Sequence, residues 1–236
     1  MSSSVEPVTG DVSGLLLITD TLQTPGSGVL GYLLTRAIRQ GECVCLVSIG
    51  PSRPYYLGLT RRLGLNLANL ELAGHVRFID YLPLLESAKR EPSKASNGWL
   101  LPTVPMEQCK HPKQWILFED LTALLYWGVS VKEVMRLVVH SLSLVSESHG
   151  CVAGTIHNDD VGDVEAQTLI KLLSPMSQTK YQIRMLSSGA TQGIDGQLDV
   201  MSGPRSRERP TIRELFYKLN DSGPTFFPRG LSHGVI

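Results

Sequence analysis

The first half of the chain alternates short apolar runs with amphipathic segments. An uninterrupted apolar run bounded by turn residues is typical of a strand that is buried on both faces of a parallel sheet. Runs of this kind lie at residues 15–20 and 43–49, and a third strand is predicted at 76–81. The segments at 29–40 and 54–65 instead repeat their apolar residues with helical spacing. This order predicts parallel strands that are connected by crossover helices.

The second half begins with the same alternation and then changes. Apolar strands are predicted at 115–118 and 151–156, and Ser130 with Glu133 forms a capping-box pattern that opens a helix at residue 131. Asp163 is placed to cap a further helix that ends near residue 174. Beyond residue 181, alternating or extended segments follow at 182–188, 197–202, 212–219 and 225–227, with a hairpin turn at Asp195-Gly196.

The predicted fold class is therefore α/β, with a mostly parallel central sheet, flanking helices and C-terminal antiparallel strands. We expect a disordered N-terminus over 1–13 and a single domain over 14–236. Residues 86–114 contain four prolines among scattered lysines and serines, which predicts a surface insertion within that domain.

Composition narrows the function classes only slightly. The 236 residues are 42% hydrophobic and 19% charged, which is typical of a globular protein, and their formal net charge is zero. A neutral chain gives no bulk-charge argument for nucleic-acid or membrane binding. The sequence contains neither a signal-peptide pattern nor an apolar run of membrane-spanning length, so we expect an intracellular protein. The cysteines and histidines show no zinc spacing, so we expect no metal.

The loop after the first strand resembles a phosphate-binding loop that lacks its working groups. A functional loop of this class ends in Gly-Lys-Ser/Thr, because the lysine contacts phosphates and the hydroxyl contacts Mg²⁺. If Gly26 takes the place of the second motif glycine, Ser27 replaces the lysine and Gly28 replaces the hydroxyl residue. The first 88 residues contain no lysine at all. A tight turn of small residues is the favoured interpretation, and the helix start could still hold an anion through its backbone N–H groups.

The same glycines match G-x-G-x-x-G, ending at Gly31, but the dinucleotide interpretation fails on context. Five residues separate Asp20 from Gly26, and no acidic residue lies between Glu42 and Glu71 to hold a ribose.

An apolar strand followed by Glu119 and Asp120 resembles a Walker B element, in which an acid helps to hold Mg²⁺. Asp120 is equally suited to cap the helical segment that follows. That segment crowds Leu124, Leu125, Tyr126 and Trp127 into a short stretch, and we weigh a protein interface equally against ordinary core.

Two charged clusters remain. His157 and the acids at Asp159, Asp160 and Asp163 follow a strand, and a solvated acidic loop is favoured over acid–base or metal chemistry. Residues 201–236 hold six basic and three acidic side chains. A solvated loop is again the usual meaning, and arginine also suits phosphate recognition. The arginines that could serve such recognition are Arg205, Arg207, Arg209 and Arg213.

Several of these segments together resemble the Elongator complex protein 6 family. The resemblance covers nearly the whole chain and is weakest over 86–114. The segments that carry it are the lysine-free strand, loop and helix at 15–40, then 116–125 with Gly128, 196–198, 216–221 and 226–232.

The resemblance implies a RecA-like fold without ATPase motifs, no catalytic residue and no cofactor. It also implies that the chain joins Elongator complex proteins 4 and 5 in a heterohexameric ring. In that family the ring binds tRNA and supports modification of the wobble uridine U34, while another subunit carries the chemistry. The resemblance implies that the candidate tRNA-binding residues are Arg205, Arg207, Arg209 and Arg213, and that the protein is found in the cytoplasm and also in the nucleus. Three alternatives remain: an active NTPase with a non-standard phosphate site, a mediator of recombination that binds single-stranded DNA, and a dinucleotide-dependent enzyme.

Overall fold

The structure is a computed structural model, and it describes residues 5–7, 12–90, 113–159, 163–186, 193–206, 209–221 and 223–228. Its centre is a nine-stranded sheet with the strand order β3-β2-β4-β5-β1-β6-β7-β8-β9. The strands are β1 (Gly14–Asp20), β2 (Cys43–Ser48), β3 (Val76–Asp80), β4 (Gln114–Phe118), β5 (Cys151–His157), β6 (Ser177–Arg184), β7 (Gly196–Ser202), β8 (Ile212–Asn220) and β9 (Gly223–Pro228).

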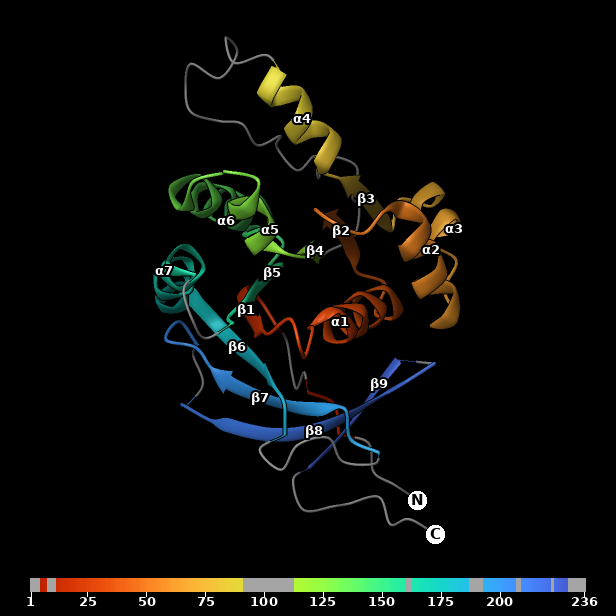
Figure 1. Cartoon of the computed structure of the whole chain (residues 1–236). Coiled ribbons are helices and arrows are strands. Elements are labelled where there is room, and N and C mark those ends of the chain that lie inside the picture. Colours follow the sequence, from red (N-terminus) through yellow and green to blue (C-terminus); the bar gives the residue numbers. More distant parts are fainter. Residues whose placement is uncertain are drawn as a thin grey trace.

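Helices cover both faces of the parallel part of this sheet (Figure 1). One side carries α1 (Ser27–Arg39), α2 (Arg53–Arg62) and α3 (Leu67–Leu72), and the other carries α5 (Leu121–Tyr126), α6 (Val131–Val145) and α7 (Val164–Leu173). The helix α4 (Leu82–Arg90) projects from the body beside β3. A short 3₁₀ turn, η2 (Ser174–Met176), joins α7 to β6.

Strand direction divides the sheet into two parts. All pairings from β3 through β6 are parallel, and those from β6 through β9 are antiparallel. A mostly parallel sheet with helices on both faces and an antiparallel extension is the predicted fold class, and it has the RecA-like arrangement. This prediction is confirmed.

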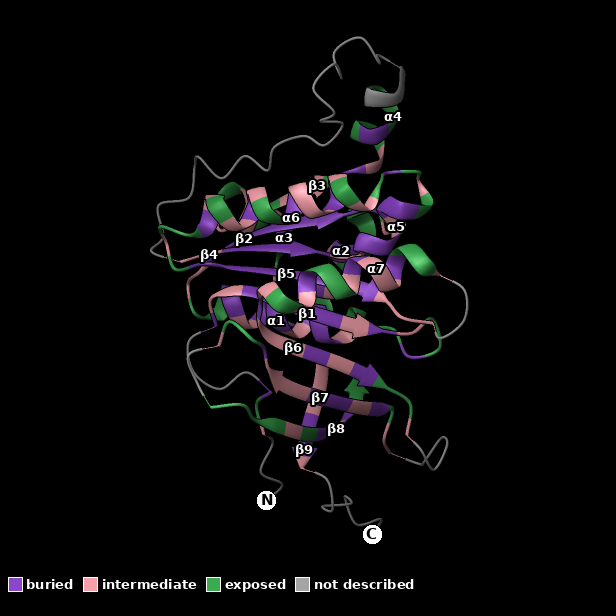
Figure 2. Cartoon of the chain, turned by 90° about the vertical axis from the view of Figure 1, so that its left-hand side faces the viewer, coloured by how far each residue is buried: buried purple, intermediate pink, exposed green. Residues whose placement is uncertain are grey.

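Each parallel strand contributes to two cores because successive side chains point to opposite faces. Leu16 and Ile18 of β1 pack with α1, whereas Leu15 and Leu17 pack with α6 and α7. The central strands are almost wholly buried, whereas β8 buries Leu215 and Tyr217 at alternate positions among more open ones (Figure 2). In β9 the adjacent residues Phe226 and Phe227 are buried between half-buried neighbours. Continuous apolar runs in the central strands and alternation in β8 follow from this difference.

Two predicted boundaries were wrong. The last parallel strand begins at Ser177 and not at residue 182, because its polar first half still pairs with β1 through the backbone. The predicted helix over 54–65 ends at Arg62, and α3 follows after Gly64, whose φ of 76° is left-handed.

Parts of the predicted disordered N-terminus and of the insertion lie outside the described residues. Within 5–7, the backbone N–H of Val5 donates to the Phe226 carbonyl at 3.0 Å, so this piece lies along β9. Val12 is buried in the core beside α1. The predicted insertion over 86–114 begins within α4 and ends at the first residue of β4, and its residues 91–112 lie outside the described part of the chain. Within the described residues, no helix combines the length and the apolar character needed to cross a bilayer.

Candidate functional site

The predicted phosphate-site and Walker B-like residues meet at one edge of the sheet. Asp20 ends β1, His157 ends β5, and Glu119 with Asp120 follows β4. Because β1 and β5 are adjacent and parallel, Asp20 and His157 lie directly opposite each other in the register. The carboxyl edge of an open α/β sheet is where ligands of this fold class bind, so this edge is the candidate site.

The loop between β1 and α1 closes around a carboxylate of its own chain. Asp20 is 2% exposed, and its Oδ2 accepts the backbone N–H of Gly26 at 2.5 Å. Gly26 is the N-terminal cap of α1 and has no side chain to cap the helix. A Cβ at this position would lie 3.1 Å from both Asp20 Oδ2 and Ile183 Cδ1, so a larger residue would crowd these two side chains. Asp20 therefore occupies the position beside the helix start that favours an anion.

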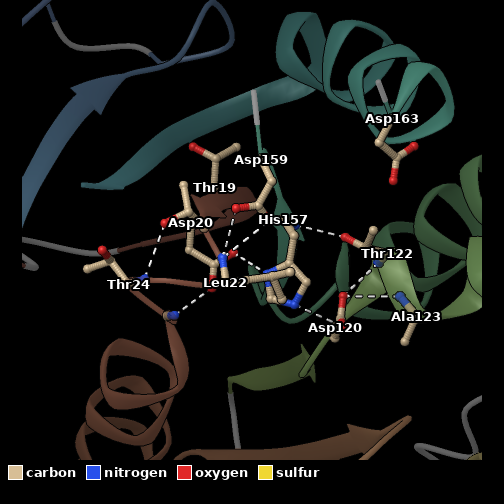
Figure 3. A network of polar contacts seen from close by, with 12 residues as sticks. Thr19, Asp20, Leu22, Thr24, Asp120, Thr122, Ala123, His157, Asp159 and Asp163 are labelled. Atoms are coloured by element: carbon tan, nitrogen blue, oxygen red, sulfur yellow. Dashed lines mark hydrogen bonds and ion pairs between the residues drawn. The ribbon is translucent and has the colours of Figure 1, made fainter. Parts of the chain in front are cut away.

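His157 bridges two carboxylates (Figure 3). Its Nδ1 lies 2.6 Å from Asp20 Oδ1, and its Nε2 lies 3.2 Å from Asp120 Oδ2. The hydrogen bonds to Asp120 and Asp20 raise the pKa of His157 to about 10, against the opposing effect of burial. The imidazole is therefore a cation at neutral pH.

Asp120 also caps α5. Its Oδ1 accepts the backbone N–H groups of Thr122 at 2.8 Å and Ala123 at 3.2 Å. The Thr122 hydroxyl in turn accepts the backbone N–H of His157 at 2.8 Å. The capping interpretation of Asp120 is confirmed, and the cap connects the β4 end to the β5 end.

Glu119 is the other half of the Walker B-like pair. Burial, followed by repulsion from Asp120, raises the pKa of Glu119 to about 7, although backbone hydrogen bonds from Ile49 and Gly50 oppose the shift. Its Oε2 is buried and has no hydrogen-bond partner among the described residues. The carboxyl group therefore faces the segment that follows β2.

Two further aspartates hold the surrounding loops. Both carboxylate oxygens of Asp159 accept the Leu22 backbone N–H, at 3.1 and 3.2 Å. Asp163 caps α7 through the Ala166 N–H at 2.9 Å and accepts the Tyr126 hydroxyl at 3.0 Å. These carboxylates serve loop and helix ends, and Asp160 lies outside the described residues.

This arrangement is poorly suited to binding a nucleotide phosphate. The loop's anion position is taken by Asp20, and the neighbouring carboxylates at Asp120 and Asp159 would repel a further anion. The cation at the site, His157, is already shared between two carboxylates. In the part of the chain that the structure describes, no cluster of three metal-ligating side chains is present.

The structure separates the four candidate interface residues. Leu124 and Leu125 are buried in the core beside α6, and Trp127 packs against the same cluster. Tyr126 is 68% exposed, so it is the side chain of the four that lies on the surface. An interface role stays a prediction for this segment, in which Tyr126 is the most accessible of the four side chains.

The candidate arginines also differ from one another. Arg205 and Arg209 are exposed, and Arg207 lies outside the described residues. Arg213 is half-buried, and its guanidinium donates to the carbonyl oxygens of Glu6 at 3.0 Å and Pro7 at 3.5 Å. Arg213 therefore holds the N-terminal segment, and Arg205 and Arg209 are more accessible to a phosphate backbone.

The bridging role of His157 was missed by sequence reasoning, which treated it as part of a solvated acidic loop. The available signal was an acid at the end of one apolar strand and a histidine at the end of another. Using that signal requires knowing that β1 and β5 are neighbours, which the sequence pattern does not state.

Comparison with known proteins gives one consistent family. The model of the family described as "Elongation complex protein 6" matches residues 100–221. The chain is 27% identical to Elongator complex protein 6 of Xenopus laevis, over 90% of this chain and 89% of that protein. It is 24% identical to the Homo sapiens protein of the same name, over 94% and 93% of the two chains. For the Danio rerio protein the identity is 23%, over 99% and 97%.

Proposed function

The chain belongs to the Elongation complex protein 6 family, and from this membership we propose that it is a non-catalytic subunit of the Elongator complex. In the proposal it assembles with Elongator complex proteins 4 and 5 into a heterohexameric RecA-like ring. The ring binds tRNA and supports modification of the wobble uridine, in the cytoplasm and the nucleus.

The observation that supports a non-catalytic role is the carboxylate at the start of α1. A nucleotide-hydrolysing site needs positive charge beside the β- and γ-phosphates. Here the Asp20 carboxylate accepts the Gly26 N–H at 2.5 Å, and the loop contains no lysine. A bound phosphate would have to displace an internal anion from the same backbone donor.

The same edge offers surface for a neighbouring subunit. Leu22 and Tyr126 are 69% and 68% exposed, and both are held in place by hydrogen bonds to aspartates, Asp159 and Asp163. Exposed apolar side chains on a fixed backbone lower the ordering cost of association, which favours a role in assembly.

The test is native mass spectrometry of the chain alone and co-expressed with Elongator complex proteins 4 and 5 from the same source. We expect a complex that contains two copies of each protein. A chain that stays monomeric in the presence of both partners would contradict the proposal.

Nucleotide binding is measured on the isolated chain in parallel. We expect no saturable binding of labelled ATP, with or without Mg²⁺. Saturable binding that Ser27→Asp abolishes would instead support an active phosphate site at this loop.

A further inference from the structure

We infer that His157 is a built-in cation that takes the place of an external ligand at the carboxyl edge and clamps the β1–α1 loop to the start of α5. The clamp consists of Asp20, His157 and Asp120, which come from three adjacent strand ends. It goes beyond the proposed function because it concerns the isolated chain and does not require the ring.

The geometry requires both ring nitrogens to donate. Nδ1 faces a carboxylate oxygen at 2.6 Å, and Nε2 faces another at 3.2 Å. A neutral imidazole carries one N–H, so it would leave a lone pair directed at one of the two carboxylates. The doubly protonated ring satisfies both contacts, and two charge-assisted hydrogen bonds hold it.

Each end of the clamp continues into a segment of the edge. Asp20 receives the Gly26 N–H through its second carboxylate oxygen, and this contact fixes the loop against the start of α1. Asp120 caps α5 through Thr122 and Ala123. A single imidazolium therefore couples the positions of the loop and of α5, which ordinarily depend on separate contacts.

The ionisable groups that surround His157 are all carboxyl groups. Asp20 faces it from β1 and Asp120 from the β4–α5 junction, and Glu119 interacts with it electrostatically from the end of β4. Asp159 lies two residues along the chain and is bonded to the Leu22 N–H of the same loop. All four groups are carboxyls, and the two that contact the ring directly, Asp20 and Asp120, stabilise its protonated form.

The clamp also makes the conformation of this edge independent of a bound ligand. In a nucleotide-binding domain the corresponding loop responds to whether phosphate and metal are bound. Here the cation and both anions belong to the chain, so the loop does not depend on a diffusible ligand. We expect its conformation to be indifferent to nucleotide.

The first test is the titration of the imidazole signals of the full chain by nuclear magnetic resonance. The chain has six histidines, and the signal that is missing from His157→Gln identifies the one of interest. We expect its midpoint near 10, whereas an unperturbed histidine titrates near about 6.5. If all six signals titrate below about 7.5, within the usual range for histidine, the clamp is refuted.

The second test is amide hydrogen exchange at pH 7 in His157→Gln, with His149→Asn as the matched control. His149 lies at the opposite end of β5 and has a φ of 49°, which asparagine tolerates. We expect the amides of Leu22, Gly26 and Thr122 to exchange at least tenfold faster in His157→Gln, and at the wild-type rate in the control. Unchanged exchange in a folded His157→Gln protein would overturn the inference.

Adding Mg-ATP to the wild-type chain completes the test. We expect exchange at these three amides to stay unchanged, and protection by the nucleotide would show that the edge still takes an external ligand. If His157→Gln fails to fold, the wild-type titration decides, since a folded chain with a signal near 10 supports the clamp and one without it does not. None of these results depends on whether the ring assembles.

Discussion

The stability of this chain should fall as the pH rises above neutrality, and one histidine should account for a measurable share of the fall. The perturbation is His157→Gln, which removes the titrating group and keeps a side chain that can donate one hydrogen bond. The folded-state pKa of His157 is raised to about 10, while its unfolded value is near 6.5. The contribution is therefore fully present below pH 6.5 and is lost as the pH rises through 10.

The size of this contribution to the free energy of unfolding follows from the difference between the two pKa values of His157. A difference between 6.5 and 10 corresponds to at most about 5 kcal/mol, at about 1.4 kcal/mol for each pH unit. Solvent screening reduces it, because the His157 and Asp120 side chains are each 17% exposed, although Asp20 is 1% exposed. We expect a net contribution of about 2–3 kcal/mol near pH 7, between the ranges for surface and buried ion pairs.

The assay is urea denaturation of both proteins from pH 6 to pH 10.5. Tyrosine, lysine and cysteine ionise over this range in both proteins, so the difference between the two unfolding free energies isolates His157. We expect the difference to shrink steadily from pH 7 to pH 10.5. The His149→Asn variant should run parallel to the wild type throughout.

A difference that stays constant across this range would refute the reasoning, because it would mean that His157 does not change its protonation state between pH 7 and 10.5. A difference that grows with pH would mean that folding lowers the pKa of His157, so that the folded state favours the neutral ring.

Three further outcomes are expected. Gly154→Val should destabilise the chain by about 1–3 kcal/mol in urea denaturation, because a Cβ at residue 154 would lie 2.7 Å from Leu121 Cδ1. The control Gly58→Ala in α2, where a Cβ would meet no atom within 4 Å, should be neutral or slightly stabilising. Burial raises the pKa of Glu119 to about 7, so the stability of the wild type relative to Glu119→Gln should fall as the pH rises from 4.5 to 7; a constant difference between the two proteins would contradict the shift. Charge reversal of three arginines in the β7–β8 connection should weaken tRNA binding by the assembled ring and flatten its salt dependence; the three are Arg205, Arg207 and Arg209. An unchanged affinity across a salt titration would show that these arginines are not part of the tRNA site.

The order of apolar and amphipathic segments along the chain is enough to predict the layers of this protein. Continuous apolar runs at β1, β2, β4 and β5 required a sheet that is covered on both faces, and the alternation after residue 181 required strands with one face toward solvent. Short-range sequence patterns also predicted the capping box at Ser130 and the helix caps at Asp120 and Asp163, and the structure contains all three. These features depend on residues that are close in sequence, which is why a pattern of spacing predicts them.

Tertiary structure decided which strand ends meet and therefore what the carboxyl edge can do. Asp20 and His157 are 137 residues apart, and they touch because β5 pairs with β1 in a particular register. Likewise, Leu124 and Leu125 are core while Tyr126 is exposed, because α5 packs on β5 through one side. The missing lysine showed that a phosphate-binding group was absent, and the fold placed a carboxylate and an imidazolium at that edge. The physical reason is that charge pairing acts through space, between groups that only the packed sheet brings within hydrogen-bonding distance.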